Sequence, residues 1–219
     1  KKLEFHSYPK SLDQYQQQFE TVSSHIHYGN SFLVNLTHQT PIKCNYDLKE
    51  IYDLSRAKYK VLLDERFVCF SPETFIRTED NIVYSHPMKG TIDGELPDAA
   101  AKILADPKEM AEHITIVDLI RNDLSMISEN VKVTKFRYID RLETNHKSLL
   151  QVSTEISGSL KENWQADLGN MIFQLLPAGS ITGAPKEQTM SIIREAEDYK
   201  RGYYSGICGY FDGENLDTG

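Results

Sequence analysis

The chain has 219 residues, of which 40% are hydrophobic and 26% are charged, and its formal net charge is −8 at pH 7. This length allows one large or two small globular domains, and the negative charge argues against nucleic acid or an acidic membrane surface as a partner. No apolar run approaches the roughly 18 residues that cross a membrane, and no signal-peptide pattern opens the sequence. Cys44, Cys69 and Cys208 are too widely spaced to indicate a disulfide framework or a thiolate metal site. We therefore expect a cytoplasmic protein.

The N-terminal part of the sequence predicts two helices and a group of short strands. Apolar residues recur at helical spacing from Leu12 to Ile26, and Gly29 follows where a C-cap glycine belongs. A second helix is predicted over residues 46–58. Alternating apolar and polar residues predict further strands, with a turn at Ser71-Pro72. These strands cover residues 32–37, 66–70, 74–78 and 81–85.

The C-terminal part combines helices with longer strands. Asp106 and Pro107 mark the start of a helix that reaches Leu124, with Glu109 as a capping-box residue. The other predicted elements are strands over 131–138, 149–160 and 203–211, and helices over 168–176 and from 185 onward. Because the strands come in groups rather than in regular βαβ alternation, the pattern predicts an α+β fold with antiparallel sheet.

The stretch from Ser85 to Gly94 places a lysine beside a glycine at the end of a predicted strand. Pro87 ends that strand, and Gly90 frees the backbone directly after Lys89. A lysine held in this way is well placed to meet a substrate, although the same pattern also fits a solvated surface lysine.

Glu109 and Glu112 stand three residues apart on one face of the predicted helix. Two carboxylates so placed can hold one hard cation, one directly and one through water, as Mg²⁺ prefers. The alternative is that Glu109 caps the helix and Glu112 is a first-turn charge that interacts with the helix dipole.

Two further features are candidates for chemistry. The loop over residues 179–184 offers backbone N–H groups to an anion ahead of Pro185, with Lys186 nearby, or it is an ordinary loop that caps a helix. Glu73 lies at a turn between two strands, where it is either a general acid whose pKa is raised by burial or an exposed turn glutamate.

Three longer segments together resemble the chorismate-utilising enzymes. They read FVCFSPETFIRTEDNIVYSHPMKGTIDG, KEMAEHITIVDLIRNDLS and LLPAGSITGAPKEQTMSIIREAE followed by RGYYSGICGYFDG. This family includes anthranilate synthase component I, aminodeoxychorismate synthase component I, and the isochorismate and salicylate synthases. The resemblance extends from about Tyr15 to the end of the chain. It implies a layered α/β fold in which antiparallel sheets pack between helices, forming a single chorismate-binding catalytic domain over residues 1–219.

The resemblance implies catalytic roles for two residues. Lys89 matches the lysine of the family's PIKGT motif, which in the aminodeoxychorismate synthases attacks C2 of chorismate and displaces the C4 hydroxyl. Anthranilate and isochorismate synthases usually carry alanine at this position. An amine whose pKa is lowered by burial can make this attack, and ammonia then displaces it at C4. Glu73 matches the general acid that protonates the leaving hydroxyl.

The resemblance also implies a magnesium site and a substrate site. Glu112 matches a carboxylate that binds Mg²⁺, and Glu109 matches one that reaches the ion through water. The ion would neutralise the ring carboxylate of chorismate and so ease attack on the ring. The positions that match the family's substrate-binding residues are Gly90, Thr91, Thr182 and Gly183.

Two departures from the family pattern limit the reaction. Leu33 stands where the isochorismate and salicylate synthases place a lysine base for water. Gln151 aligns with a histidine that anthranilate synthase uses to eliminate pyruvate, with His146 as an alternative match. We therefore place Gln151 in the substrate site and expect the reaction to stop at an aminated, unaromatised product.

These implications favour the aminodeoxychorismate synthase branch of the family. Chorismate and ammonia would give 4-amino-4-deoxychorismate, on the route to 4-aminobenzoate and folate, with a glutamine amidotransferase partner supplying the ammonia. Anthranilate synthase, isochorismate synthase and a non-catalytic chorismate-binding homologue follow as alternatives, in that order. Because the family's second pair of metal carboxylates has no match before Gly219, we also expect the natural chain to continue beyond that residue.

Overall fold

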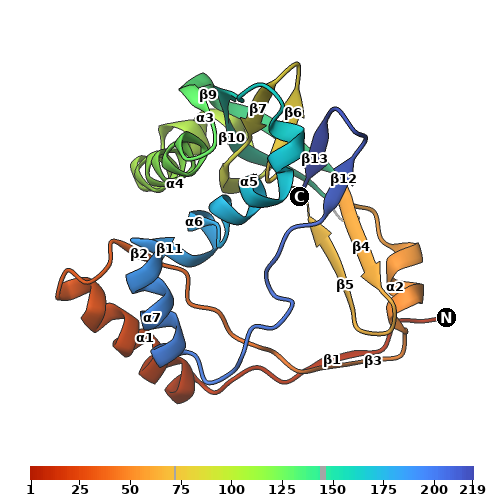
Figure 1. The fold of residues 1–219 in the computed structure, drawn as a ribbon. Helices are drawn as coiled ribbons and strands as arrows, with labels where there is room; N and C mark the ends of the chain where they lie inside the picture. The colour runs from red at the N-terminus through yellow and green to blue at the C-terminus, as the bar shows by residue number, and fades with distance from the viewer. Residues whose placement is uncertain (72, 144–146) are drawn as a thin grey trace. The chain divides into compact units, whose positions relative to one another are not determined.

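The computed structural model describes residues 1–71, 73–143 and 147–219, without the side chain of residue 143 (Figure 1). The predicted turn at Ser71-Pro72 and the alternative match His146 therefore fall on residues outside these ranges. The chain separates into two compact units. Unit 1 comprises Lys1–Ser71 and Pro177–Gly206, and unit 2 comprises Pro72–Leu176 and Ile207–Gly219. The function of the chain as one catalytic domain stays a prediction. Across the described ranges, no helix is both long and apolar enough to cross a membrane.

Unit 1 is organised around two helices, α1 (Leu12–His27) and α7 (Lys186–Ala196), which pack against each other (Figure 1). Ser11 begins α1 with a capping box, and Gly29 follows it with a left-handed φ of +76°, as the sequence predicts. The buried centre of this unit is made by Val22 of α1 with Ile192 and Ala196 of α7. The two helices thereby form the platform on which the rest of unit 1 is placed.

Short elements complete unit 1. The strand β2 (Leu33–Val34) pairs with β11 (Gly183–Ala184), which follows the four-residue helix α6 (Gly179–Thr182). The remaining elements are the pair β1 (Phe5–Ser7) with β3 (Ile42–Cys44), the helix α2 (Leu48–Leu54), and the hairpin β4 (Tyr59–Leu63) with β5 (Phe67–Ser71).

Unit 2 is built on one antiparallel sheet. Its long central strand β10 (Ser148–Ser159) pairs with β9 (Glu129–Glu143) on one side, and with β7 (Ile82–Ser85) and β8 (Met88–Asp93) on the other. The sheet continues through β6 (Arg77–Glu79), β13 (Leu216–Thr218) and β12 (Gly209–Phe211). All pairings between the described strands are antiparallel, which confirms the predicted α+β class.

Helices cover one face of this sheet (Figure 1). The helix α4 (Pro107–Ser125) packs on β8, β9 and β10, and α3 (Ala99–Ala105) lies beside it. A short 3-10 turn, η1 (Trp164–Asp167), leads into α5 (Leu168–Leu175). The core combines residues from these helices with residues from the sheet, namely Ile76, Val83, Val117, Leu124, Ile156, Leu160, Trp164, Met171, Leu175 and Leu216.

Several predicted boundaries were wrong for identifiable reasons. The strand predicted over 32–37 is reduced to β2. Asn35 N–H still donates to Thr182 O in the register of β11, but Thr37 N–H donates to the Glu197 carboxylate, so the ladder does not continue that far. The strand predicted over 203–211 begins only at Gly209, because Tyr204 N–H bonds back to Arg201 O in a turn. The predicted loop over 178–184 contains α6 and β11.

Candidate functional site

Lys89 lies within β8 rather than at the end of the preceding strand, and its side chain meets α4. Its Nζ atom is 3.2 Å from Glu112 Oε2, and Lys108 Nζ approaches the other carboxylate oxygen at 3.6 Å. The Lys89 side chain is 43% exposed and that of Glu112 is 40% exposed. The burial expected of a nucleophilic lysine is therefore not observed, and such a role requires that the ion pair with Glu112 opens.

Gly90 permits close approach between β8 and the start of α4. Its φ is +85°, and a β-carbon at this position would lie 2.8 Å from Glu109 Oε2. Asp106 caps α4 through the N–H groups of Lys108 and Glu109, as predicted, but the Glu109 carboxylate faces Gly90 instead of completing a capping box. Tertiary contact with β8 thus overrides the local cap. Gly90, Glu109, Lys89 and Glu112 are brought together in one cluster.

A buried histidine anchors this part of α4 to the sheet. His113 is fully buried, and its Nε2 atom is 2.6 Å from Thr154 Oγ1 on β10. Desolvation and the positive charge of Arg137 lower its pKa, while the Lys89 backbone acts in the opposite direction. The residue is therefore neutral near pH 7 and fixes the helix turn that carries Glu109 and Glu112. The sequence analysis missed it, although an isolated histidine inside an amphipathic helix is a visible signal.

Glu73 lies close enough to this cluster for its charge to interact with Lys89. Although the residue as a whole is exposed, desolvation of its carboxyl group raises its pKa, and the positive charge of Lys89 partly offsets this rise. A raised pKa keeps more of the carboxyl group protonated near neutral pH, which is the state that a general acid requires.

Thr91 and Gln151 pair with each other across β8 and β10. The Gln151 Oε1 atom is buried and has no hydrogen-bond partner within the described part of the chain. A buried acceptor without a partner is costly and often marks a position where a ligand or water binds. The register between β8 and β10 shifts next to this pair, at the position of Lys89 and Gly90, so that the bulge re-aims the lysine toward α4.

The two remaining predicted substrate residues, Thr182 and Gly183, belong to unit 1. Both are buried. The Thr182 hydroxyl donates to Ala178 O at 3.1 Å, and the Gly183 N–H donates to Gly179 O. An anion that binds the Gly183 N–H would have to replace Gly179 O as its acceptor. The φ of +121° at Gly183 is open to glycine alone, because a β-carbon there would lie 1.8 Å from Leu33 O.

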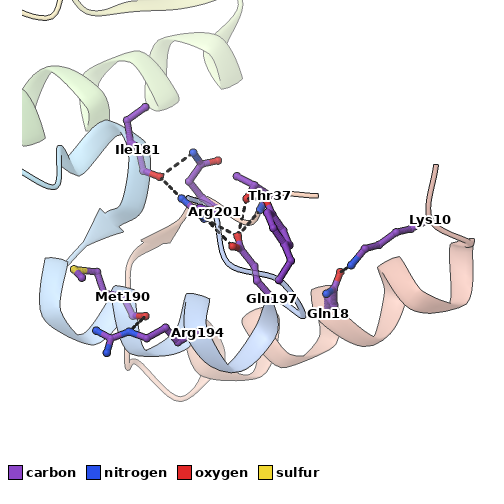
Figure 2. Close-up of polar contacts among 10 residues, drawn as sticks. Lys10, Gln18, Thr37, Ile181, Met190, Arg194, Glu197 and Arg201 are labelled. Carbon is purple, nitrogen blue, oxygen red and sulfur yellow. Dashed lines mark hydrogen bonds and ion pairs between the residues drawn. The ribbon is translucent and has the colours of Figure 1, made fainter. Parts of the chain in front are cut away.

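A buried ion pair beside this loop was not anticipated from the sequence (Figure 2). Glu197, which ends α7, accepts hydrogen bonds from Thr37 and from Arg201, and Arg201 also reaches Ile181 O. Desolvation of Glu197 is the largest effect on its pKa and raises it, but the hydrogen bonds from Arg201 and Thr37 together bring the pKa below its ordinary value. The i, i+4 spacing of Glu197 and Arg201 was the available signal.

Glu109 and Glu112 are the two carboxylates of unit 2 that could bind a magnesium ion together with water. Among the residues that the structure describes, no group of three or more His, Cys, Asp or Glu side chains is gathered as a metal centre. Glu112 and Glu109 therefore supply two carboxylates, and Mg²⁺ accepts one or two of these together with water or substrate oxygens. Glu112 can take this role only by exchanging its contact with Lys89.

Fold and site together define a mixed α/antiparallel-sheet protein with a lysine–carboxylate cluster on its sheet edge. The sequence matches the family described as chorismate binding enzyme over residues 3–219. The chain is 52% identical over 216 residues to an uncharacterized PabA-like protein of Haemophilus influenzae, covering 99% of this chain and 66% of the relative. It is 30% identical over 217 residues to aminodeoxychorismate synthase component 1 of Bacillus subtilis, covering 93% and 45%.

A solved structure shares the fold. Anthranilate synthase component I from Streptococcus pneumoniae superposes with a TM-score of 0.80 at 28% identity, covering 99% of this chain and 49% of the other. The chain thus spans between 45% and 66% of the length of these three proteins. It belongs to the chorismate-binding enzyme family, which confirms the resemblance drawn from its motifs.

Proposed function

We propose that the protein that contains this chain is an aminodeoxychorismate synthase component I. It would convert chorismate and ammonia to 4-amino-4-deoxychorismate in the cytoplasm, with the ammonia delivered by a glutamine amidotransferase partner. The observation that carries the proposal is Lys89, an amine on the strand edge, held 3.2 Å from Glu112 and electrostatically coupled to Glu73. Amination at C4 through a covalent lysine needs this set of groups, namely a nucleophile, a general acid and carboxylates for a cation.

The proposed reaction assigns a separate task to each group. Glu73 protonates the C4 hydroxyl, which leaves as water, while the neutral Lys89 amine forms a bond to C2 and both conjugated ring double bonds shift toward C4. Ammonia then adds at C4, the two double bonds shift back, the bond between Lys89 and C2 breaks, and a proton from the added ammonia returns to the Glu73 carboxylate. Magnesium bound at Glu112 and Glu109 would neutralise the ring carboxylate and so favour attack on the ring. Because Lys89 and Glu112 form an ion pair without substrate, binding must separate them before attack.

Two residues favour this reaction over those of other family members. Gln151 stands where the motif comparison expects the histidine used for pyruvate elimination, and its buried Oε1 can accept a hydrogen bond but cannot shuttle a proton as an imidazole does. Leu33, which pairs with Ala184, offers no base to activate water. Anthranilate synthase remains the second candidate, because a protein of that name shares the fold along 99% of this chain.

Product identification tests the proposal. The full natural protein is incubated with chorismate, ammonium and Mg²⁺, with and without an added aminodeoxychorismate lyase, and the products are analysed by mass spectrometry and fluorescence. We expect 4-aminobenzoate only when the lyase is present. Fluorescent anthranilate without lyase would contradict the proposal in favour of the second candidate, and unconsumed chorismate would indicate a homologue without turnover.

A further inference from the structure

We propose that Arg201 and Glu197 are positioning residues for chorismate binding, which act by fixing the backbone of Ile181, Thr182 and Gly183 from behind. The inference rests on the proposed function, in that Thr182 and Gly183 are taken to contact chorismate. It adds two residues that the motif comparison gives no role. Their contacts in unit 1 lead to this assignment (Figure 2).

The ion pair is buried and its hydrogen bonds are satisfied. The Glu197 side chain is 2% exposed and that of Arg201 is 15% exposed. Glu197 Oε1 accepts from Thr37 N at 2.9 Å, from Thr37 Oγ1 at 2.8 Å and from Arg201 Nη2 at 2.6 Å, while Oε2 accepts from Arg201 Nε at 2.9 Å. A carboxylate with these donors holds the guanidinium in one orientation, since the fork geometry matches both oxygens.

The oriented guanidinium also donates to the backbone of two other segments. Arg201 Nη2 donates to Asn35 O at 2.7 Å, and Nη1 donates to Ile181 O at 3.4 Å. Asn35 joins the same backbone, because its Nδ2 donates to Ile181 O at 3.0 Å and its N–H donates to Thr182 O at 2.9 Å. Arg201 and Asn35 therefore hold two successive carbonyl groups directly before Gly183.

The held segment consists of two short elements. The helix α6 is four residues long, and β11 is two residues long. Gly183 cannot shift freely toward β2, because its α-carbon is so close to Leu33 O that no β-carbon fits between them. The Thr182 N–H and hydroxyl both donate to Ala178 O inside the segment, and the hydrogen bonds to Ile181 O and Thr182 O tie the segment to Arg201 and Asn35 outside it. A displacement of about 1 Å in such a segment can cost up to about a hundredfold in activity.

Chorismate affinity provides the test. The dissociation constant is measured by calorimetry for the full natural protein and for Arg201→Lys, Asn35→Leu and Lys10→Met. Arg201→Lys keeps the positive charge but loses the planar guanidinium that bonds both Glu197 oxygens. Asn35→Leu removes the other side-chain donor to Ile181 O and leaves Glu197 and Arg201 unchanged. We expect each to weaken binding about tenfold, because a tenfold change corresponds to about 1.4 kcal/mol, which is on the scale of one hydrogen bond. Lys10→Met is the control, because Lys10 pairs with Asp198 in the same unit but contacts no residue of the held segment.

A double variant separates positioning from a general structural role. If Arg201 acts partly through Thr182, Arg201→Lys causes a smaller loss of affinity in the Thr182→Ala background than in the unaltered protein, because coupled residues are not additive. Unchanged affinity in both Arg201→Lys and Asn35→Leu would overturn the proposal, as would losses that multiply in the double variant. Absence of chorismate binding by the unaltered protein would overturn it together with the proposed function. Chorismate binding followed by anthranilate formation would overturn only the proposed function.

Discussion

Each unit contains one ion pair between a basic side chain and a glutamate, and the two pairs differ in their exposure to solvent. Lys89 pairs with Glu112 in unit 2, and Arg201 pairs with Glu197 in unit 1. Lys89 and Glu112 are each about two-fifths exposed and share a single contact of 3.2 Å. Glu197 is buried and Arg201 is only 15% exposed; two hydrogen bonds join them, and the carboxylate has further donors. Exposed pairs contribute little to stability because water and salt screen them, whereas a buried charge that loses its partner is strongly destabilising.

The difference shows which pair is able to change partners. Glu112 already shares its carboxylate between Lys89 and Lys108, so that exchanging one ammonium for another cation costs little. Glu197 has no comparable freedom, because four hydrogen bonds would be lost. The exposed pair is therefore suited to chemistry and the buried pair to holding the backbone in place.

The largest expected effect is on activity at the exposed pair. We expect Lys89→Ala to reduce 4-amino-4-deoxychorismate formation with ammonia at least about a thousandfold, as when other covalent nucleophiles are removed. Its matched control is Lys108→Ala, because Lys108 contacts the same carboxylate but has no assigned role. Product formation is followed by the lyase-coupled assay. Near-normal activity of Lys89→Ala would show that Lys89 is not the nucleophile.

The next effect is on stability at the buried pair. Arg201→Met leaves the Glu197 carboxylate buried without its partner, and we expect the free energy of unfolding to fall by about 3 kcal/mol. Lys89→Ala should change it by less than about 0.5 kcal/mol, since the pair is exposed. Urea denaturation of both variants measures the contrast. Equal decreases in the free energy of unfolding of Arg201→Met and Lys89→Ala would show that the two ion pairs contribute equally to stability.

A smaller effect is expected on metal dependence. Glu112→Gln removes a charge that Mg²⁺ needs, so the Mg²⁺ concentration for half-maximal activity should rise about tenfold or more, together with a weaker affinity for chorismate. Asp118→Asn, further along α4 and paired with the exposed Arg121, serves as the control. A magnesium titration with the same midpoint as the unaltered protein would contradict the assignment of Glu112.

The smallest effect concerns acid stability. The pKa of Glu197 is lowered in the folded state, so its contribution is complete above the ordinary glutamate pKa of about 4.3 and is lost as the pH falls through the lowered value. Glu197→Gln should therefore lose stability at pH 7 but show a shallower further loss between neutral and acid pH. Denaturation curves of both proteins from pH 7 to pH 3 measure this. Parallel pH profiles would show that Glu197 does not titrate differently on folding.

Sequence patterns were sufficient where a local rule controls the structure. Asp106 begins α4 as its capping side chain predicts, and Gly29 follows α1 with a left-handed backbone conformation. The strand over 149–160 was found because its alternation extends over many residues. The shorter elements α3, β1, β3 and β4 were missed, since a few residues carry too little periodicity to predict them.

The helix α1 shows how a correct element can have an unexpected environment. Its apolar residues follow helical spacing, yet Leu12 is 75% exposed and Phe19 is 51% exposed, whereas Val22 is buried against α7. Spacing indicates which residues share a face of the helix. It does not indicate which face a partner covers, because that depends on the packing of distant segments.

The sequence by itself determined the family, the α+β class and the identities of the candidate site residues, because motifs and caps depend on neighbouring residues. Only the tertiary structure decided which of these residues meet. Lys89 reaches Glu112 because of a bulge between β8 and β10, and Glu109 leaves its capping role to face Gly90. Glu197 and Arg201 are held together with Thr37 and Asn35, which lie 160 and 166 residues earlier in the chain. Such contacts arise from packing, which acts over distances that no local pattern contains.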